Sequence, residues 1–184
     1  VENLRAVDPG VETEGVGVVN VTASGELEPE PLRQHYLRTT DALSALPGVA
    51  SAAMIQRLPL RDHGDNWGIT IYGQPADQEV STTALRVVTR DYFDVMGIRV
   101  LRGRGFEPTD RQGSELAIVI DETLAEKYFP GQDPIGQQIA SGTGQGWMRV
   151  IAVVETVAHA GLTDEPEAGR YVLLDQYEYI PGSA

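Results

Sequence analysis

The stretch from Leu85 to Gly136 decides the fold of this chain: LRVVTRDYFDVMGIRVLRGRGFEPTDRQGSELAIVIDETLAEKYFPGQDPIG. Its pattern predicts a strand, a short helix, a strand, an exposed loop, a buried strand, a helix and a turn. Leu85, Val87 and Thr89 alternate along the chain with Arg86, Val88 and Arg90. This alternation indicates a strand. Leu116 to Ile120 is a continuous apolar run of strand length, typical of a strand that is buried on both faces.

Capping signals place two helices within the same stretch. Thr89 or Asp91 can cap a short helix that Gly97 ends. Asp121 can cap a second helix, which stops at Pro130-Gly131 because proline disrupts the hydrogen bonding of a helix interior.

Toward the N-terminus, residues 16–22 and 49–58 have the composition of strands on either side of the longest predicted helix, Pro29 to Leu46. That helix carries one apolar stripe at near-helical spacing, formed by Leu32, Tyr36, Leu43 and Leu46. A strand, helix and strand in this order predict a right-handed crossover between parallel strands.

Toward the C-terminus and in the remaining middle, further strands are predicted at residues 67–72 and 170–174, and a hairpin from residues 137–140 and 148–154. Strands and helices are mixed without strict alternation. This order favours an α+β fold over a doubly wound parallel sheet.

The composition excludes several classes of protein. The chain has 14 basic and 27 acidic residues, a net charge of −13, which argues against nucleic acid and against anionic lipid headgroups as partners. It has no cysteine, so disulfides, thiolate chemistry and cysteine-based zinc sites are excluded. No apolar run approaches the roughly 20 residues that a membrane helix needs, and no signal peptide is present.

The order of three segments resembles a known family: RDYFDVMGIRVLRGRGF, then IVIDETLAEKYFPGQDPIG, then VIAVVETVAHAGL. It is similar to the extracytoplasmic core domain of MacB-like and FtsX-like ABC-transporter permeases, and among them to the large bacterial permeases that carry this domain twice. LRAVDPGVETEGV and LPGVASAAMIQRLPL extend the resemblance over nearly the whole chain. The chain departs from the expected pattern at Gly105 and Thr156, where we expect acids, and at Asp121, where we expect Asn.

The resemblance implies one domain over residues 1–184, made of two lobes. A mixed-sheet lobe with the crossover helix would use residues 11–91 and 157–184, and a smaller α/β lobe inserted in the middle would use residues 92–156. The resemblance further implies that this is a soluble segment cut from between two membrane helices, on the outer side of the bacterial inner membrane. It implies a cytoplasmic ABC ATPase as partner, acting through those helices, and leaves room for an extracytoplasmic protein partner. We expect the isolated domain to be monomeric.

Several motifs invite a chemical interpretation, and each has a simpler one that we prefer. Asp62-His63-Gly64-Asp65 offers metal-capable side chains in a single short loop, whereas a metal site needs several converging ligands. Gly142, Gly144 and Gly146 precede a strand instead of a helix, which favours a hairpin over a phosphate-binding loop. His159 is either a structural hydrogen-bonding residue or a pH-sensitive contact.

No combination of an acid, a base and a nucleophile is readable, so we predict no catalytic residue, no bound metal and no cofactor. The aromatic residues Tyr92, Phe93, Tyr128 and Phe129 are spaced for core packing. The polar loop from Phe106 to Glu115 is either an ordinary connection or a contact for a partner.

The leading hypothesis is therefore a non-catalytic domain that relays ATP-driven motion of membrane helices to a partner or substrate outside the membrane. The alternative is a receptor for a small ligand or peptide, with a pocket lined by Trp67, Trp147 and residues 61–66.

Overall fold

The computed structural model describes residues 11, 14–22, 28–59, 65–74, 82–141, 146–158 and 167–178. Its helices are α1 (Pro29–Ser44), α2 (Tyr92–Val95) and α3 (Glu122–Tyr128). Its strands are β1 (Asp65–Ile71), β2 (Thr82–Val88), β3 (Val100–Gly103), β4 (Ala117–Asp121), β5 (Gln138–Ser141), β6 (Trp147–Val154) and β7 (Gly169–Leu173). The mixture of strands and helices confirms the predicted α+β class.

The seven strands form one sheet in the order β3-β6-β4-β7-β2-β1-β5, and β5 pairs with β6 as well as with β1. This last pairing closes six strands into a ring, while β3 lies outside the ring along the edge of β6. The strand directions are mixed, because β4 runs parallel to β6 but antiparallel to β7, and β2 runs parallel to β7. The predicted hairpin is confirmed as the antiparallel pair β5–β6.

Two apolar cores lie on the two faces of this sheet. All six ring strands contribute to the first core, which also contains Leu32 of α1 and Leu124 of α3 and therefore fills the ring. The second core lies outside the ring, where α2 and Phe106 cover the other face of β2, β4, β6 and β7. All five residues of β4 are buried, which confirms the prediction of a strand covered on both faces.

The predicted Asp121 cap is confirmed, whereas the predicted side-chain cap of α2 is wrong: Asp91 stands at its N-cap without a capping bond, and the Thr89 hydroxyl accepts from the Met54 backbone N–H at 2.8 Å instead. The Asp121 carboxylate accepts a hydrogen bond from the Leu124 backbone N–H at 2.7 Å and so caps α3. Gly97 follows α2 with φ of 64°, a left-handed conformation that glycine adopts without a steric cost. The predicted core aromatics Tyr92, Phe93 and Phe129 are buried, and Tyr128 is half-buried against the first core.

The two strands predicted on either side of α1 are wrong. Residues 16–22 form no strand, and residues 49–58 contribute only an isolated antiparallel bridge between Ile55 and Val88. The β-branched residues of both segments suit a strand, but strand formation needs a neighbour to pair with. The expected crossover between parallel strands is consequently absent from the described residues.

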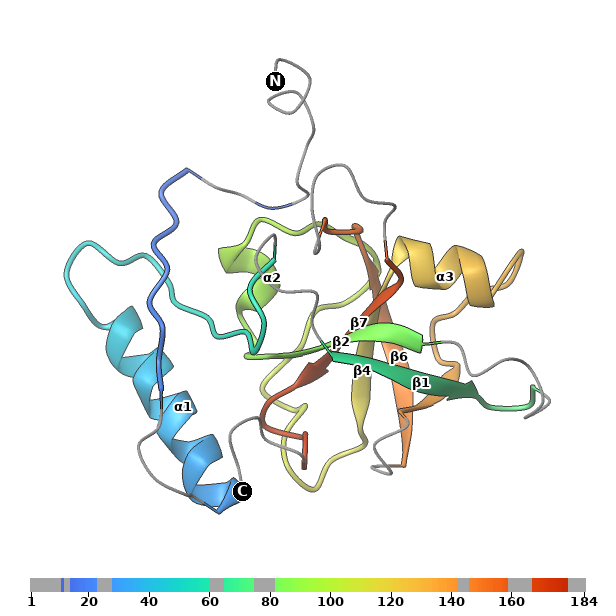
Figure 1. Ribbon diagram of the computed structural model, residues 1–184, viewed down its shortest axis with the longest axis horizontal. Coiled ribbons are helices and arrows are strands. Elements are labelled where there is room, and N and C mark those ends of the chain that lie inside the picture. The colour runs from blue at the N-terminus through green and yellow to red at the C-terminus, as the bar shows by residue number, and fades with distance from the viewer. Residues whose placement is uncertain are drawn as a thin grey trace.

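The helix α1 lies on one side of the ring and α3 on the other (Figure 1). The first turns of α1 hold this helix in place. Leu32 is fully buried, and the buried Arg33 donates to the carbonyl oxygens of Leu174 at 3.1 Å and Tyr177 at 2.7 Å. The far end of the predicted stripe is not covered, since Leu46 is 51% exposed and lies beyond the end of the helix. Neither α1 nor any other helix within the described ranges is long and apolar enough to cross a membrane.

The division into two lobes stays a prediction. The sheet runs across the expected seam, because β4 from the middle of the chain pairs with β7 from its C-terminal part.

Candidate functional site

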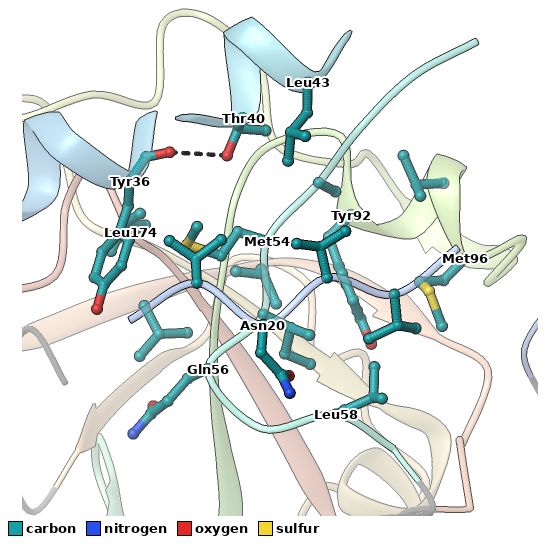
Figure 2. A pocket seen from close by; sticks show the side chains of 18 of the residues that line it. Asn20, Tyr36, Thr40, Leu43, Met54, Gln56, Leu58, Tyr92, Met96 and Leu174 are labelled. Carbon is teal, nitrogen blue, oxygen red and sulfur yellow. Dashed lines mark hydrogen bonds between the residues drawn. The ribbon is translucent and has the colours of Figure 1, made fainter. Parts of the chain in front are cut away.

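A groove of about 530 Å³ lies between α1 and the body of the domain. One wall is α1, another is the segment 53–58, and the floor comes from the end of β2 and from α2 (Figure 2). The lining residues are Val16, Gly17, Val18, Val19, Asn20, Val21, Thr22, Tyr36, Thr40, Leu43, Ala53, Met54, Ile55, Gln56, Leu58, Val87, Val88, Tyr92, Val95, Met96 and Leu174.

Among the described residues that line the groove there is no Asp, Glu, Lys, Arg or His, although 22% of the chain is charged. Its polar side chains are uncharged amides and hydroxyls. Figure 2 shows the Tyr36 hydroxyl and the Gln56 amide toward one end of the groove, and Leu58 and Met96 toward the other. Most of the lining side chains are thus apolar, and the polar ones are spread along the groove.

Residues 16–22, which we call the strap, run along the groove. Asn20 of the strap lies between Gln56 and Leu58 in the view of Figure 2. Among the described residues, no backbone hydrogen bond joins the strap to the rest of the domain. Val18 is 56% exposed and Val19 is 67% exposed, so half of the strap's apolar surface faces solvent. The strap is the least firmly attached wall of the groove.

Tyr92 forms part of the floor and is only 1% exposed. Burial raises the pKa of its phenol far above the usual value, and the nearby Arg86 guanidinium opposes this only in part. Its hydroxyl has no hydrogen-bond partner among the described residues. A phenol that stays protonated throughout the physiological range is not a base, so Tyr92 serves the groove as an aromatic surface.

A buried carboxyl group lies at the junction of β4, α3 and β7 and takes no part in lining the groove. Asp121 is fully buried, and its carboxylate accepts from the backbone N–H groups of Leu124 and Gly169, each at 2.7 Å. Burial raises the pKa of Asp121 to about 7, although these two hydrogen bonds and Arg86 favour the charged form. Its contacts are all within the fold, and they join α3 to the start of β7.

Thr156, a second position at which the chain departs from the expected family pattern, supports the same junction. Its hydroxyl accepts from the Thr123 backbone N–H at 3.1 Å and lies 2.9 Å from the Thr123 hydroxyl. The third departure, Gly105, has open space where a side chain would project.

The loop from Phe106 to Glu115 is held by two buried polar residues. Asp110 accepts from both Nη atoms of Arg104, at 2.6 and 3.0 Å, and from the Glu107 backbone N–H at 2.8 Å. Burial alone would raise the pKa of Asp110, but these bonds hold it below the usual value. Gln176 donates to the Ser114 hydroxyl and to the Glu115 carbonyl, each at 2.8 Å. The loop therefore presents one fixed shape, and a role in partner contact stays a prediction.

Most of the motifs considered for chemistry fall outside the described residues. These are Asp62, His63 and Gly64 of the metal-capable loop, Gly142 and Gly144 of the glycine-rich loop, and His159. Gly146 lies just before β6 with φ of 98°, in agreement with a hairpin turn. Within the part of the chain that the structure describes, no three His, Cys, Asp or Glu side chains are grouped so as to hold a metal ion.

The pocket expected around Trp67 and Trp147 is not the groove, which neither tryptophan lines. Trp67 is 39% exposed on β1, and Trp147 packs edge-on against Tyr72 with ring centroids 5.3 Å apart. The groove itself was missed, because its walls come from segments that were expected to pair as strands. The one signal of the groove in the sequence was the end of the apolar stripe of α1, at Leu43 and Leu46.

Comparison with known proteins identifies relatives of the chain. Residues 1–181 match the family described as the MacB-like periplasmic core domain. The "Macrolide export ATP-binding/permease protein MacB 2" of Aeromonas hydrophila is 30% identical over 154 residues, which is 75% of this chain and 24% of that protein. The MacB protein of Mannheimia succiniciproducens is 24% identical over 145 residues, which is 79% of this chain and 20% of that protein. The chain thus spans about a quarter or less of these curated relatives.

Two solved structures share the fold. The periplasmic region of MacB from Actinobacillus actinomycetemcomitans superimposes with a TM-score of 0.55 at 18% identity, covering 76% of this chain and 55% of that one. The extracellular domain of the ABC-type transporter YknZ from Gram-positive bacteria superimposes with a TM-score of 0.50 at 17% identity, covering 95% of this chain and 68% of that one. At such identities the likeness is one of fold.

Proposed function

Because the chain belongs to the MacB-like periplasmic core domain family, we propose that it acts as a non-catalytic relay in an ABC transporter permease. As the periplasmic core domain of such a permease, it lies on the outer side of a membrane. The proposal is that ATP-driven motion of flanking membrane helices passes through this domain to a substrate or partner outside. The family match over residues 1–181 is the observation that carries it.

The construction of the ring supports a mechanical role. A relay must transmit displacement without deforming, and close-packed interiors resist deformation. The closure of β5 onto both β1 and β6 leaves no free edge within the six-stranded ring, and β4 is buried along its whole length. Such a body moves as a unit when its ends are pulled.

The chemistry of the groove supports a role without catalysis. Within the described part of the chain its walls supply no carboxylate, imidazole, amine or guanidinium, and Tyr92 on its floor stays protonated. General acid–base chemistry needs a group whose pKa lies near the working pH and which can reach a substrate. Asp121 has such a pKa, but its carboxylate is fully buried and occupied by two backbone N–H groups.

The remaining parts of the proposal concern partners and location. A cytoplasmic ABC ATPase would drive the motion from the far side of the bacterial inner membrane, through helices outside this segment. The fixed loop from Phe106 to Glu115 is the surface that we propose for a protein partner, since Asp110 and Gln176 hold it in shape before contact. Two lobes and a monomeric isolated domain belong to the same proposal.

The relay can be tested in the intact transporter by measuring distances between spin labels. The chain has no cysteine, so labels can be placed on single introduced cysteines without background. One pair, at the exposed positions Arg111 and Glu126, reports on the domain itself. A second pair joins Glu126 to the outer end of a flanking membrane helix.

ATP binding is expected to change the second distance and leave the first unchanged. A transporter whose ATPase cannot bind nucleotide is the control and should show neither change. A first distance that shifts with ATP, or a second that stays constant, would contradict the relay. The full-length gene gives a simpler check, because a run of about 20 apolar residues should lie on each side of this domain.

A receptor for a small ligand is the second candidate function, and the groove between α1 and the ring favours it. A ligand present at a hundred times its dissociation constant should stabilise the folded chain by about 2.7 kcal/mol. A thermal-shift screen against metabolites and peptides measures this.

A further inference from the structure

We propose that the groove beneath the strap is a binding site for an uncharged, mainly apolar small molecule with a hydrogen-bonding group at one end. This goes beyond the relay, which requires no ligand in the groove. The inference rests on the size of the groove, the absence of charge from its walls, the position of its polar groups and the loose attachment of the strap.

The size of the groove suits a small molecule. Ligand pockets in proteins are typically roughly 300–1,000 Å³ and are lined mainly by apolar side chains with a few polar groups. This groove, of about 530 Å³, falls within that range. It is a hollow between side chains from five segments, and it does not offer the broad flat surface on which a folded partner docks.

The walls select against charge. Burying an ionised group in apolar surroundings without a partner costs several kcal/mol or more, and none of the lining residues that the structure describes carries an opposite charge that could compensate. The whole chain has a net charge of −13, which makes the surroundings of the groove unfavourable for anions as well. An uncharged ligand avoids both costs.

The polar groups give the site a direction. The Tyr36 hydroxyl lies toward one end, where it can bind a carbonyl, ether or hydroxyl group. Leu58 and Met96 lie toward the other end among mostly apolar side chains, with the Tyr92 hydroxyl as the polar group there. Met96 is a side chain that adapts its shape to irregular apolar partners.

The strap provides access. Its backbone makes no hydrogen bond to another described residue, so displacing it breaks only side-chain contacts. Val18 is 56% exposed and Val19 is 67% exposed, so the displacement uncovers less than half of the surface of each residue. A ligand can therefore enter under the strap without disturbing the ring.

Two nearly isosteric fluorescent probes test the charge selection. N-phenyl-1-naphthylamine is neutral, and 8-anilinonaphthalene-1-sulfonate is the same framework with an added sulfonate. Titrated into the 184-residue chain, the neutral probe should show saturable fluorescence at one site per chain. The anionic probe should bind at least about tenfold more weakly. Equal or tighter binding of the anionic probe, or no saturable binding of the neutral one, would overturn the proposal.

Matched substitutions test the location. Ala53 lines the groove, whereas the adjacent, similarly half-buried Ala52 does not. Ala53→Trp should fill the space and weaken binding of the neutral probe at least about tenfold, while Ala52→Trp should leave it within about twofold. Equal effects of the two substitutions would place the probe elsewhere and contradict the site.

If circular dichroism shows that Ala53→Trp does not fold, a second pair of substitutions tests the location of the site. Leu43 is a half-buried lining residue of α1, and the preceding Ala42 is exposed and outside the lining. Leu43→Glu should weaken binding of the neutral probe at least about tenfold by placing a charge in the groove, and Ala42→Glu should not. A Leu43→Glu chain that binds the neutral probe as tightly as the unaltered chain would exclude this site, while leaving the relay untouched.

Discussion

The strand β4 and the helix α1 are held in the domain in different ways. All five residues of β4 are buried, and it pairs with β6 on one side and with β7 on the other. Of the sixteen residues of α1, only Leu32, Arg33 and Thr40 are buried, two of them in its first turn. The strand is part of a closed ring, whereas the helix is an arm attached at one end with a groove along its side.

The difference indicates that the ring and the arm have different mechanical roles. The ring has the packing of a body that transmits force, because displacing any one strand must break pairing on both of its sides. The arm, here the second half of α1 with the strap, can move without disturbing the ring, since few buried contacts oppose it. We expect substitutions to separate the two regions by the size of their effects on stability.

The largest expected effect on stability comes from truncating a buried side chain of a ring strand. Ile120→Ala on β4 removes a fully buried side chain from the first core and should lower the free energy of unfolding by about 2–5 kcal/mol. Leu46→Ala removes a similar side chain that is 51% exposed beyond α1 and should change it by less than about 0.5 kcal/mol. Urea unfolding measures both, and equal losses would remove the distinction between ring and arm.

Detaching the arm at its anchor should have the next largest effect. Arg33→Ala removes the bonds to the carbonyl oxygens of Leu174 and Tyr177 and should cost about 1.5–3 kcal/mol, the range for hydrogen bonds to a charged group. The exposed Arg38 on the same helix is the control, and Arg38→Ala should have almost no effect. Unchanged stability of the Arg33→Ala chain would show that α1 is held by other contacts.

Adding one methyl group at the junction of β4 and β7 should cost about 1–3 kcal/mol. A Cβ atom on Gly169 would lie 2.8 Å from the Asp121 carboxylate oxygen, which its two hydrogen bonds hold in place. Gly105→Ala is the matched control, because a Cβ atom there meets nothing within 4 Å. Thermal unfolding measures the stability of both variants. A loss for the Gly169 variant alone indicates a tightly packed junction, whereas equal stability of the two variants indicates that the junction adjusts to the added methyl group.

The last prediction concerns pH, where the effect accumulates gradually over several pH units. The pKa of Asp121 rises from its ordinary value of 3.8 to about 7 in the folded chain. The folded state therefore holds a proton that the unfolded state releases. Asp121 contributes stability below its unfolded pKa, and this contribution is lost as the pH rises through about 7.

Comparison of the unaltered chain with Asp121→Asn isolates this contribution. Between about pH 4 and pH 7 the stability of the unaltered chain should fall relative to the variant, with a slope on the order of 1 kcal/mol per pH unit. Asp133→Asn, at an exposed ion pair with Arg102, should leave the slope unchanged. If the stability of the unaltered chain and of Asp121→Asn changed with pH in the same way, the raised pKa of Asp121 would be contradicted.

The parts of the fold that depend on neighbouring residues could be predicted from the sequence. The apolar run of β4, the Asp121 cap and the end of α2 at Gly97 each follow from a few adjacent residues. The closure of the ring could not be predicted, because the β1–β5 pairing joins residues about 70 positions apart. No local pattern specifies such a partner.

The groove was unpredictable for a related reason. Residues 16–22 and 49–58 carry the β-branched side chains of strands, and a strand-forming composition does not reveal whether a partner strand is present. In the structure the strap has none among the described residues, and the space that pairing would have filled is the groove. The pocket expected around Trp67 and Trp147 stays a prediction, because residues 61–64 of its expected lining lie outside the described part of the chain.

Native-state hydrogen exchange of the intact transporter, with and without ATP, tests the stiffness of the ring most directly. The amides of β4, β6 and β7 should exchange only through global unfolding and at the same rate in both states. Those of the second half of α1 should exchange faster, through local opening. Ring amides that exchange as fast as those of α1, or that lose protection when ATP binds, would contradict a rigid relay.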